Sequence, residues 1–254
     1  MDEVSIGNRR TLLKGIASLG VASLTGCSSD PPTYGNVLRM GDWLTYQTQR
    51  LLLPRQSLAR EYELSDISST LAIGSIDPGN PDKSYFSPEF GPKYASLRKS
   101  EFADWRLRVE GAVLNPREFT LTELKRLPRR TQITKHTCEE GWSAISQWTG
   151  VPLAAVLRAA GTRPSARYVQ FYPYDDVADG IDMIDALHPQ TILAYGMNGA
   201  DLPIAHGAPL RLRVERQLGY KSMKFLRRIV VTDEFDDHGS QGWLRNGWSW
   251  YVGI

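Results

Sequence analysis

His136-Thr137-Cys138-Glu139-Glu140-Gly141-Trp142-Ser143 is the most informative run in this 254-residue chain. Residues 130–137 read as a strand, so Cys138 follows a strand end and precedes a Gly-Trp turn, a position typical of the edge of a cleft. A thiolate there can act as a nucleophile, a redox centre or a metal ligand. The residues alone leave these roles open, together with a buried and inert cysteine.

Around this run, the hydrophobic pattern predicts short strands mixed with a few short helices, an α+β domain. Trp105, Leu107 and Val109 alternate with charged residues, as in a half-buried strand. Thr120-Leu121-Thr122-Glu123 is a capping box that opens a helix ending before Pro128. A second helix is expected over 153–160, ended by Gly161. Further strands are expected at 167–172, 192–195, 202–204, 210–215 and 229–232, with a hairpin at Asn198-Gly199 and a short helix or turn at 182–188.

Residues 1–26 have the features of a targeting segment. Asn8-Arg9-Arg10-Thr11-Leu12-Leu13-Lys14 resembles a twin-arginine export signal, although an amphipathic helix is an alternative. Leu24-Thr25-Gly26-Cys27 then resembles a bacterial lipoprotein box, with Cys27 as the lipidated residue. An ordinary signal peptide with an incidental Cys27 is the other interpretation. We therefore expect a periplasmic lipoprotein, in which Cys138, the second of two cysteines, has no disulfide partner.

The next part of the chain is expected to be a tether and an N-terminal arm over 27–75. Residues 28–50 are polar, and 51–100 contain strong breakers such as Pro78-Gly79-Asn80-Pro81. Aromatic residues in this stretch favour an arm that wraps over a site rather than a disordered linker. Residues 76–254 are expected to form the catalytic domain. A net charge of +2 gives no reason to expect nucleic acid, and no apolar run is long enough to span a membrane.

Two glycine-containing stretches carry a second group of polar residues. They are His206-Gly207-Ala208-Pro209-Leu210-Arg211 and Gly219-Tyr220-Lys221-Ser222-Met223-Lys224. Glycine allows close approach of a ligand to the backbone, while Arg and Lys suit a phosphate group. A solvated basic edge is the alternative interpretation.

Taken together, six segments in order resemble the molybdopterin domain of the sulfite oxidase family over residues 80–235. The resemblance lies in Trp105–Gly111, Phe119–Leu124, Thr137–Ser143, Trp148–Leu153, His206–Arg211 and Gly219–Lys224. The small periplasmic, methionine-sulfoxide-reducing members without a haem domain are the most similar in organisation. The resemblance implies a mixed β-sheet domain of the α+β class that binds one Mo-molybdopterin and transfers oxygen atoms in two-electron steps.

By position in the family pattern, the resemblance also implies roles for particular residues. Cys138 would be the thiolate ligand of molybdenum, and Glu140 a catalytic carboxylate near the metal. The pterin and its phosphate would be held by His206, Arg211, Ser222, Met223 and Lys224, and also by Glu89 in the N-terminal arm.

The chain departs from sulfite oxidases at the substrate end. Those enzymes place arginines after the ligating cysteine, whereas Glu139 and Glu140 follow Cys138 here and would repel sulfite. We therefore expect a small-molecule or protein S-oxide or N-oxide as substrate. Glu139 is expected to face solvent, and Asp175, Asp176 and Asp179 to form a solvated turn.

No Cys-x-x-Cys-His motif for haem occurs, and the cysteines are too few for an iron–sulfur cluster. The electron partner is therefore expected to be an external haem protein. Little sequence follows Val231, so a second sandwich domain is not expected and the protein is expected to be a monomer. Trp243, Trp248, Trp250 and Tyr251 form either core contacts, which we favour, or a docking patch.

Two rival functions remain at this point. Cys138 and His136 lie two residues apart, on one face of a strand, and this spacing allows a cysteine-dependent cell-wall hydrolase. A non-catalytic envelope lipoprotein that binds a partner is the other. The first leaves the basic glycine-containing cluster unexplained, and the second explains neither the export signal nor the Cys138 run.

Overall fold

The computed structural model describes residues 34–69, 76–234 and 248–254, and the side chains from residue 40 onward in these ranges. The chain divides into two units, Met1–Gly41 and Asp42–Ile254, and the second contains nearly all the regular structure. The export signal, Cys27 and Trp243 lie outside the described residues. Within the described ranges, no helix is both long enough and apolar enough to cross a membrane.

The described α-helices are α2 (Tyr34–Leu52), α3 (Gly91–Lys99), α4 (Leu121–Arg126), α5 (Leu153–Ala160) and α6 (Met183–Ala186), and the 3-10 helices are η1 (Leu64–Asp66), η2 (Ile204–His206) and η3 (Gly219–Lys221). The strands are β1 (Arg106–Gly111), β2 (Arg117–Thr120), β3 (Arg130–Thr137), β4 (Ser143–Pro152), β5 (Tyr168–Pro173), β6 (Asp179–Asp182), β7 (Ile192–Met197), β8 (Ala200–Asp201), β9 (Arg211–Arg213) and β10 (Leu226–Thr232).

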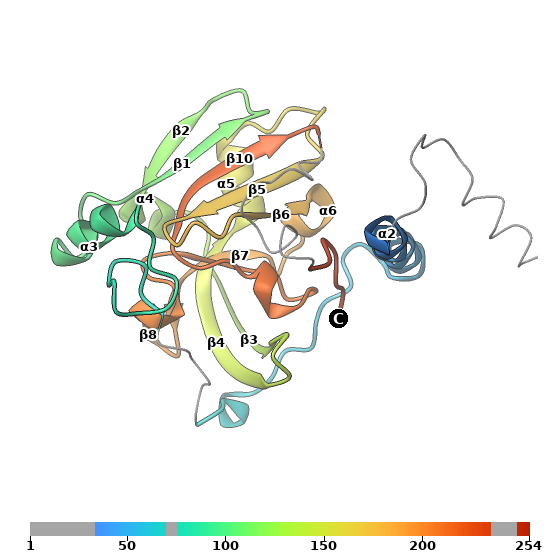
Figure 1. Ribbon diagram of the computed structural model, residues 1–254, viewed down its shortest axis with the longest axis horizontal. Helices are drawn as coiled ribbons and strands as arrows, with labels where there is room; N and C mark the ends of the chain where they lie inside the picture. The colour runs from blue at the N-terminus through green and yellow to red at the C-terminus, as the bar shows by residue number, and fades with distance from the viewer. Residues whose placement is uncertain (1–33, 70–75, 235–247) are drawn as a thin grey trace, which may run out of the picture. The chain divides into compact units, whose positions relative to one another are not determined.

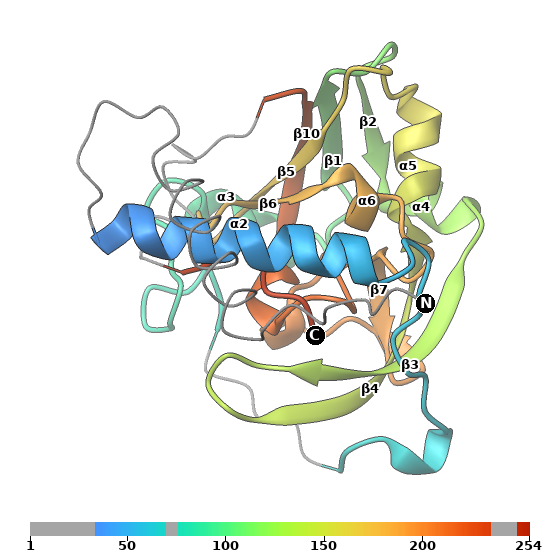
Figure 2. The ribbon, with the colours of Figure 1, turned by 90° about the vertical axis from the view of Figure 1, so that its right-hand side faces the viewer.

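The strands form two five-stranded sheets, which confirms the expected α+β class (Figure 1). One sheet has the order β2-β1-β10-β5-β6. It is mixed, because β1 and β10 are parallel while its other neighbours are antiparallel. The other runs β3-β4-β7-β8, with β9 also paired to β7. Its β3–β4 hairpin is long and curved (Figure 2) and carries the Cys138 run at its turn.

The first sheet shows how the sequence pattern produces the core. In β1, Leu107 and Val109 are fully buried, while Arg106 and Arg108 on the other face are exposed. Trp105, just before the strand, is also fully buried and donates its indole N–H to the carbonyl of Leu226 at 3.1 Å. Burying each such side chain stabilises the fold by about 1.5–3 kcal/mol.

Local signals predicted several elements correctly. Thr120 and Glu123 form the capping box of α4. Helix α5 begins after Pro152 and ends at Gly161, which has the left-handed conformation with φ 71°. The Asn198-Gly199 turn joins β7 to β8, as expected, but 202–204 does not form a strand.

Several elements were not predicted from the sequence pattern. Strands β2 and β6 were missed: each has four residues and pairs with the strand before it, β1 or β5. Strand β4, also missed, pairs with β3 across the Cys138 turn and with β7. The stretch expected to be a tether contains α2, and the irregular stretch after it contains α3. Tyr251, by contrast, packs in the interior as favoured: it is 2% exposed and meets Tyr46 edge to face.

A buried ion pair connects η3 to strand β6 at the edge of the first sheet. Lys221 in η3 donates to the Asp179 carboxylate of β6 at 2.8 Å and to the carbonyl of Gly180 at 3.1 Å. Both side chains are almost completely enclosed. The expectation that Asp179 belongs to a solvated turn is therefore wrong, because this aspartate fixes the loop that carries residues 219–224.

Removing the Lys221 charge should destabilise the protein strongly. We expect Lys221→Ala to lower the free energy of unfolding by about 3–5 kcal/mol, because it leaves Asp179 buried and uncompensated. Lys125→Ala is the matched control: its pair with Asp201 is exposed, so the loss should be below about 1 kcal/mol. Urea unfolding of the cofactor-free protein measures both. Equal losses would contradict a structural role for the buried pair.

Candidate active site

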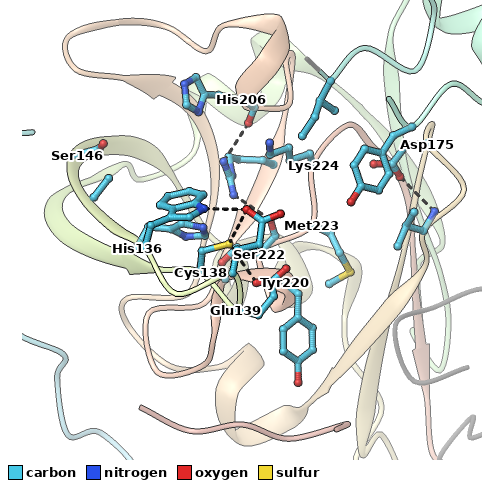
Figure 3. Close-up of a pocket in the computed structure, with 18 of the residues that line it drawn as sticks. His136, Cys138, Glu139, Ser146, Asp175, His206, Tyr220, Ser222, Met223 and Lys224 are labelled. Carbon is cyan, nitrogen blue, oxygen red and sulfur yellow. Dashed lines mark hydrogen bonds between the residues drawn. The ribbon is translucent and has the colours of Figure 1, made fainter. Parts of the chain in front are cut away.

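A cavity of about 400 Å³ opens where the second sheet meets the loops after β5 and around η3 (Figure 3). Its volume is within the range of small-molecule and cofactor sites, about 300–1,000 Å³. The cavity brings together seven of the eight predicted site residues, which come from the β3–β4 turn and from β9, η2 and the η3 loop: Cys138, Glu140, His206, Arg211, Ser222, Met223 and Lys224. The eighth, Glu89, is exposed and does not line it.

The thiol end of the cavity is a tight turn. Gly141 has φ 90°, a conformation that a side chain disfavours, and it turns the chain so that the Cys138 N–H donates to the carbonyl of Trp142 at 2.9 Å. The Cys138 Sγ lies 3.5 Å from a carboxylate oxygen of Glu139 and 3.8 Å from one of Glu140. Trp142 donates its indole N–H to Glu140 at 2.8 Å, so that carboxylate is held in place beside the sulfur.

Burial, reinforced by these carboxylates, raises the pKa of the Cys138 thiol to about 11. A bare thiol with that pKa is protonated at neutral pH and is a poor nucleophile. His136 does not compensate, because its Nδ1 lies 2.6 Å from the Arg213 guanidinium, a group that can only donate. Burial, followed by the charges of Arg213 and Arg211, lowers the pKa of His136 far below its usual range. These features disfavour the cysteine-dependent hydrolase.

The other end of the cavity is cationic. Arg211 is buried and donates to the carbonyls of His206 at 3.1 Å and Ser222 at 3.0 Å. Lys224 donates to the carbonyl of Ala205 at 2.9 Å. Within the described part of the chain, neither cation forms an ion pair with a carboxylate.

Burial, followed by the charge of Arg211, lowers the pKa of Lys224 to about 7. Burial and then Arg211 also lower the pKa of His206 to about 4, so this imidazole is neutral. Two enclosed cations without a counter-ion are unfavourable unless an anion joins them. The cationic end therefore fits the phosphate of a bound cofactor.

Two further groups fit a bound polar cofactor. The Ser222 hydroxyl accepts the backbone N–H of Val214 at 3.1 Å, and its own hydrogen is left to donate. Trp148 lines the cavity, and its indole N–H is buried without an acceptor in the described structure. Met223 is 5% exposed and supplies an apolar part of the wall. Among the described residues, no group of three or more His, Cys, Asp or Glu side chains could hold a metal ion by itself.

The structure adds two residues that the sequence analysis missed or misread. Asp175 lines the cavity on the side opposite His136 (Figure 3), and removal from water raises the pKa of its carboxyl to about 7. Tyr85, which lies in the stretch 51–100 expected to wrap over a site, also lines the cavity. Glu139 also lines the cavity, half-buried, so its expected solvent-facing position is wrong. The available signal for Asp175 was its position directly after a strand and a Pro-Tyr pair.

These features define a molybdopterin-binding oxidoreductase, and comparison with known sequences gives the same class. The chain belongs to the family of the oxidoreductase molybdopterin binding domain, whose profile matches residues 94–239. The resemblance to the sulfite oxidase family is thereby confirmed, together with Mo-molybdopterin as the cofactor and the assignment as an enzyme.

Three similar proteins bear names that concern sulfoxides. An Azospira oryzae protein, provisionally named protein-methionine-sulfoxide reductase subunit YedZ1, is 34% identical over 98% of this chain and 89% of its own length. The protein-methionine-sulfoxide reductase catalytic subunit MsrP of Xanthomonas campestris pv. campestris is 29% identical over 93% of this chain and 73% of its own. The MsrP of Ralstonia nicotianae is 34% identical, but over 51% of this chain and 44% of its own.

A solved structure gives the same fold. The sulfane dehydrogenase SoxCD from Paracoccus pantotrophus matches with a TM-score of 0.51 and 27% identity, over 53% of this chain and 39% of that one.

A methyl group at Gly219 should block cofactor binding. The Cβ of Gly219→Ala would lie 2.5 Å from the His136 ring, which Arg213 holds in place, and 3.0 Å from the carbonyl of Thr137. We expect at least a tenfold loss of bound molybdopterin, measured by pterin fluorescence after acid release. Gly41→Ala is the control, since its Cβ meets nothing within 4 Å. Unchanged pterin content in Gly219→Ala would contradict the close packing of this wall.

Proposed function

We propose that this protein is an exported reductase that removes oxygen from an S-oxide, with methionine sulfoxide as the substrate class. In this proposal Cys138 is the thiolate ligand of molybdenum and Glu140 a catalytic carboxylate beside it. The pterin and its phosphate are held by His206, Arg211, Ser222, Met223 and Lys224. Glu89, which is exposed and outside the cavity, is no longer included.

The opposite charges of the two cavity ends carry the proposal. Carboxylates lie 3.5 and 3.8 Å from the Cys138 sulfur, where the reacting group would enter. At about 4 Å and an effective dielectric of about 20, each pair of unit negative charges repels by about 4 kcal/mol. A sulfite anion would meet this repulsion, whereas a neutral S-oxide would not. A reductase of neutral substrates is therefore favoured over a sulfite-oxidising enzyme.

When bound, the molybdenum cofactor supplies the two-electron oxygen-atom transfer, and the protein supplies binding, orientation and electrostatics. Arg211 and Lys224 would neutralise the phosphate at one end of the cavity. The carbonyls of His206 and Ser222 hold Arg211 in position, and the carbonyl of Ala205 holds Lys224. Trp142 fixes Glu140 beside the thiol at the other. Tyr85 lines the cavity from the loop before α3 and would limit the access of water.

Asp175 is the proposed proton donor. Reduction of an S-oxide to a sulfide takes up two electrons and two protons and releases water, so a proton source near the oxygen accelerates it. The Asp175 carboxyl lines the cavity, and its pKa of about 7 keeps it partly protonated at neutral pH. The charge of Lys224 lowers the pKa of Asp175, and the charge of Asp176 raises it. The charge of Asp175 in turn adds to the rise in pKa that burial causes at Tyr85 and Tyr94.

The relatives support the substrate and the electron partner. Two of them are named as catalytic subunits of protein-methionine-sulfoxide reductases, a term that implies another subunit in those enzymes. We propose that electrons reach this chain from an external haem protein. Residues 1–26 are the proposed twin-arginine signal, 27–75 the tether and arm with a lipid on Cys27, and 76–254 the catalytic domain of a periplasmic monomer.

Metal analysis and a substrate panel test the proposal. Protein purified after export should contain molybdenum in an amount about equal to the chain, since the family binds one pterin. We expect Cys138→Ala to lower that content by more than half and to abolish turnover, because the thiolate ligand is lost. Two rates show whether the enzyme reduces or oxidises its substrate. One is the rate of reduced-viologen oxidation with methionine sulfoxide, and the other is the rate of ferricyanide reduction with sulfite or a sulfane.

Reduction of methionine sulfoxide at least about tenfold faster than oxidation of sulfite would support the proposal, because of the charge repulsion at the carboxylates. Faster oxidation of a sulfane, the substrate named for the SoxCD enzyme, would replace it with the opposite direction. Thiol-dependent hydrolysis of cell wall by metal-free protein would instead establish the rejected hydrolase.

The pH dependence tests Asp175 separately. Its raised pKa means that the proton is present below about pH 7 and lost above it, so kcat for methionine sulfoxide should fall as pH rises from 6 to 8. Asp175→Asn should lower kcat by about a hundredfold and make it insensitive to pH in this window. The neighbouring Asp176→Asn is the control: it removes a charge that adds to the rise in the pKa of Asp175, so the fall in kcat should remain and shift only slightly to lower pH. A fall of the same shape in Asp175→Asn would exclude this carboxyl as the donor.

A further inference from the structure

The C-terminal half of α2 is amphipathic in the reverse of the usual sense. Three polar residues face the domain, while Thr45, Gln47 and Thr48 are exposed. Tyr46 donates to Asp182 at 2.8 Å, and Arg50 contacts Asp182 and Asp185, both at 2.9 Å. Gln49 accepts the Tyr251 hydroxyl at 2.8 Å. Figure 2 shows this half of the helix beside α6. The helix is therefore attached through hydrogen bonds and ion pairs rather than through an apolar stripe.

The apolar residues of the same half-helix face outward. Trp43 is 60% exposed, Leu44 53% and Leu51 84%, and Leu52 is exposed as well. Leu44 and Leu51 are seven residues apart and share one side of the helix. Leu53 and Leu58 continue the exposed surface after the helix ends. We call Trp43, Leu44, Leu51, Leu52, Leu53 and Leu58 the leucine face.

A patch of large apolar side chains on a protein surface marks an interaction site. The charges around this patch indicate what it contacts. Residues 43–60 contain no Asp or Glu and three arginines, of which Arg50 is neutralised by Asp182 and Asp185. Arg55 and Arg60 are exposed. Acidic residues lie just outside this range, at Asp42, Glu61 and Glu63, and Glu61 is paired with Arg130. Exposed Leu and Trp on the helix, followed by the exposed Arg55 and Arg60, are the composition of a segment that lies in the interface of an anionic bilayer.

The position of the patch in the chain agrees with this. Six residues lie between Cys27 and the start of α2 at Tyr34, and an extended chain over these seven residue steps reaches no more than about 25 Å. A lipid on Cys27 would therefore keep α2 within reach of the membrane surface. The acyl chains of a lipidated cysteine would anchor the chain, and a contact through α2 would add a second attachment.

We propose that the leucine face is a membrane-binding surface for anionic bilayers, lying in the interface without spanning it. This inference rests on the proposed lipid anchor for its position in the chain, but not on the proposed reaction. Because Arg50, Asp182 and Asp185 attach the same helix to the catalytic domain, membrane binding through α2 also fixes the orientation of that domain on the bilayer.

The test uses the full chain carrying Cys27→Ser, which lacks the proposed lipid. We expect this variant to float with phosphatidylglycerol-containing vesicles at low salt and to bind more weakly to phosphatidylcholine vesicles. Brominated lipid in the vesicles should quench its tryptophan fluorescence. Leu44→Glu/Leu51→Glu in the same background should reduce vesicle binding at least about tenfold. The matched control is Leu114→Glu, an equally exposed leucine outside the face, which should bind as well as the parent.

Equal vesicle binding by the parent and the double variant would overturn the proposal. The proposal would also be overturned if the parent protein did not bind vesicles but formed concentration-dependent dimers in sedimentation that the double variant abolished. The leucine face would then join two copies of this chain. Loss of vesicle binding in Leu114→Glu would also overturn it, since the effect would be nonspecific. Molybdenum content and viologen-linked activity are measured on the same preparations. They should not change in the double variant, and their absence from the parent would count against the proposed function alone.

Discussion

Arg211 is the residue on which the architecture of the cavity depends. Its guanidinium donates to the carbonyl of His206 before β9 and to that of Ser222 after η3, so one side chain joins two loops that are separate in sequence. Both acceptors are neutral, and the positive charge is therefore left for a ligand. A carboxylate partner in the same place would hold the loops equally well but would cancel the attraction for a phosphate.

The rest of the domain supports this arrangement by separating charges of opposite sign. Lys221, which lies in η3 next to Ser222, is paired with Asp179 and so adds no free charge to the cationic end. Arg213, two residues from Arg211 on β9, is likewise paired with Glu215 at 2.7 Å. Among the described residues that line the cavity, Arg211 and Lys224 are the only Arg and Lys side chains, while Glu139 and Glu140 make the thiol end negative. In the proposed function, this gradient would orient a cofactor with its anionic tail at Arg211 and Lys224 and would disfavour anionic substrates near Cys138.

Parts of this fold and site could be predicted because the information is local. Alternation at Leu107 and Val109 predicted a strand, Thr120 with Glu123 predicted a helix start, and Gly161 predicted a helix end. The resemblance to a known family then assigned site residues that lie more than 80 residues apart. Other parts depended on partners that no local pattern reveals. Asp175 and Asp179 look alike in sequence, yet one lines the cavity and the other pairs with Lys221.

The sequence by itself determined the class of the protein, its cofactor and seven of the residues that line the cavity, because the Cys138 run and the two glycine-containing stretches carry the order and chemistry of the family. Only the tertiary structure decided which charges remain free. An arginine or aspartate has the same side chain whether it is paired or not, and pairing depends on which strand or loop lies opposite. The same reason applies to α2: the amphipathic pattern of a helix is in its sequence, but ion pairs from Arg50 to β6 and α6 turned the leucine face outward.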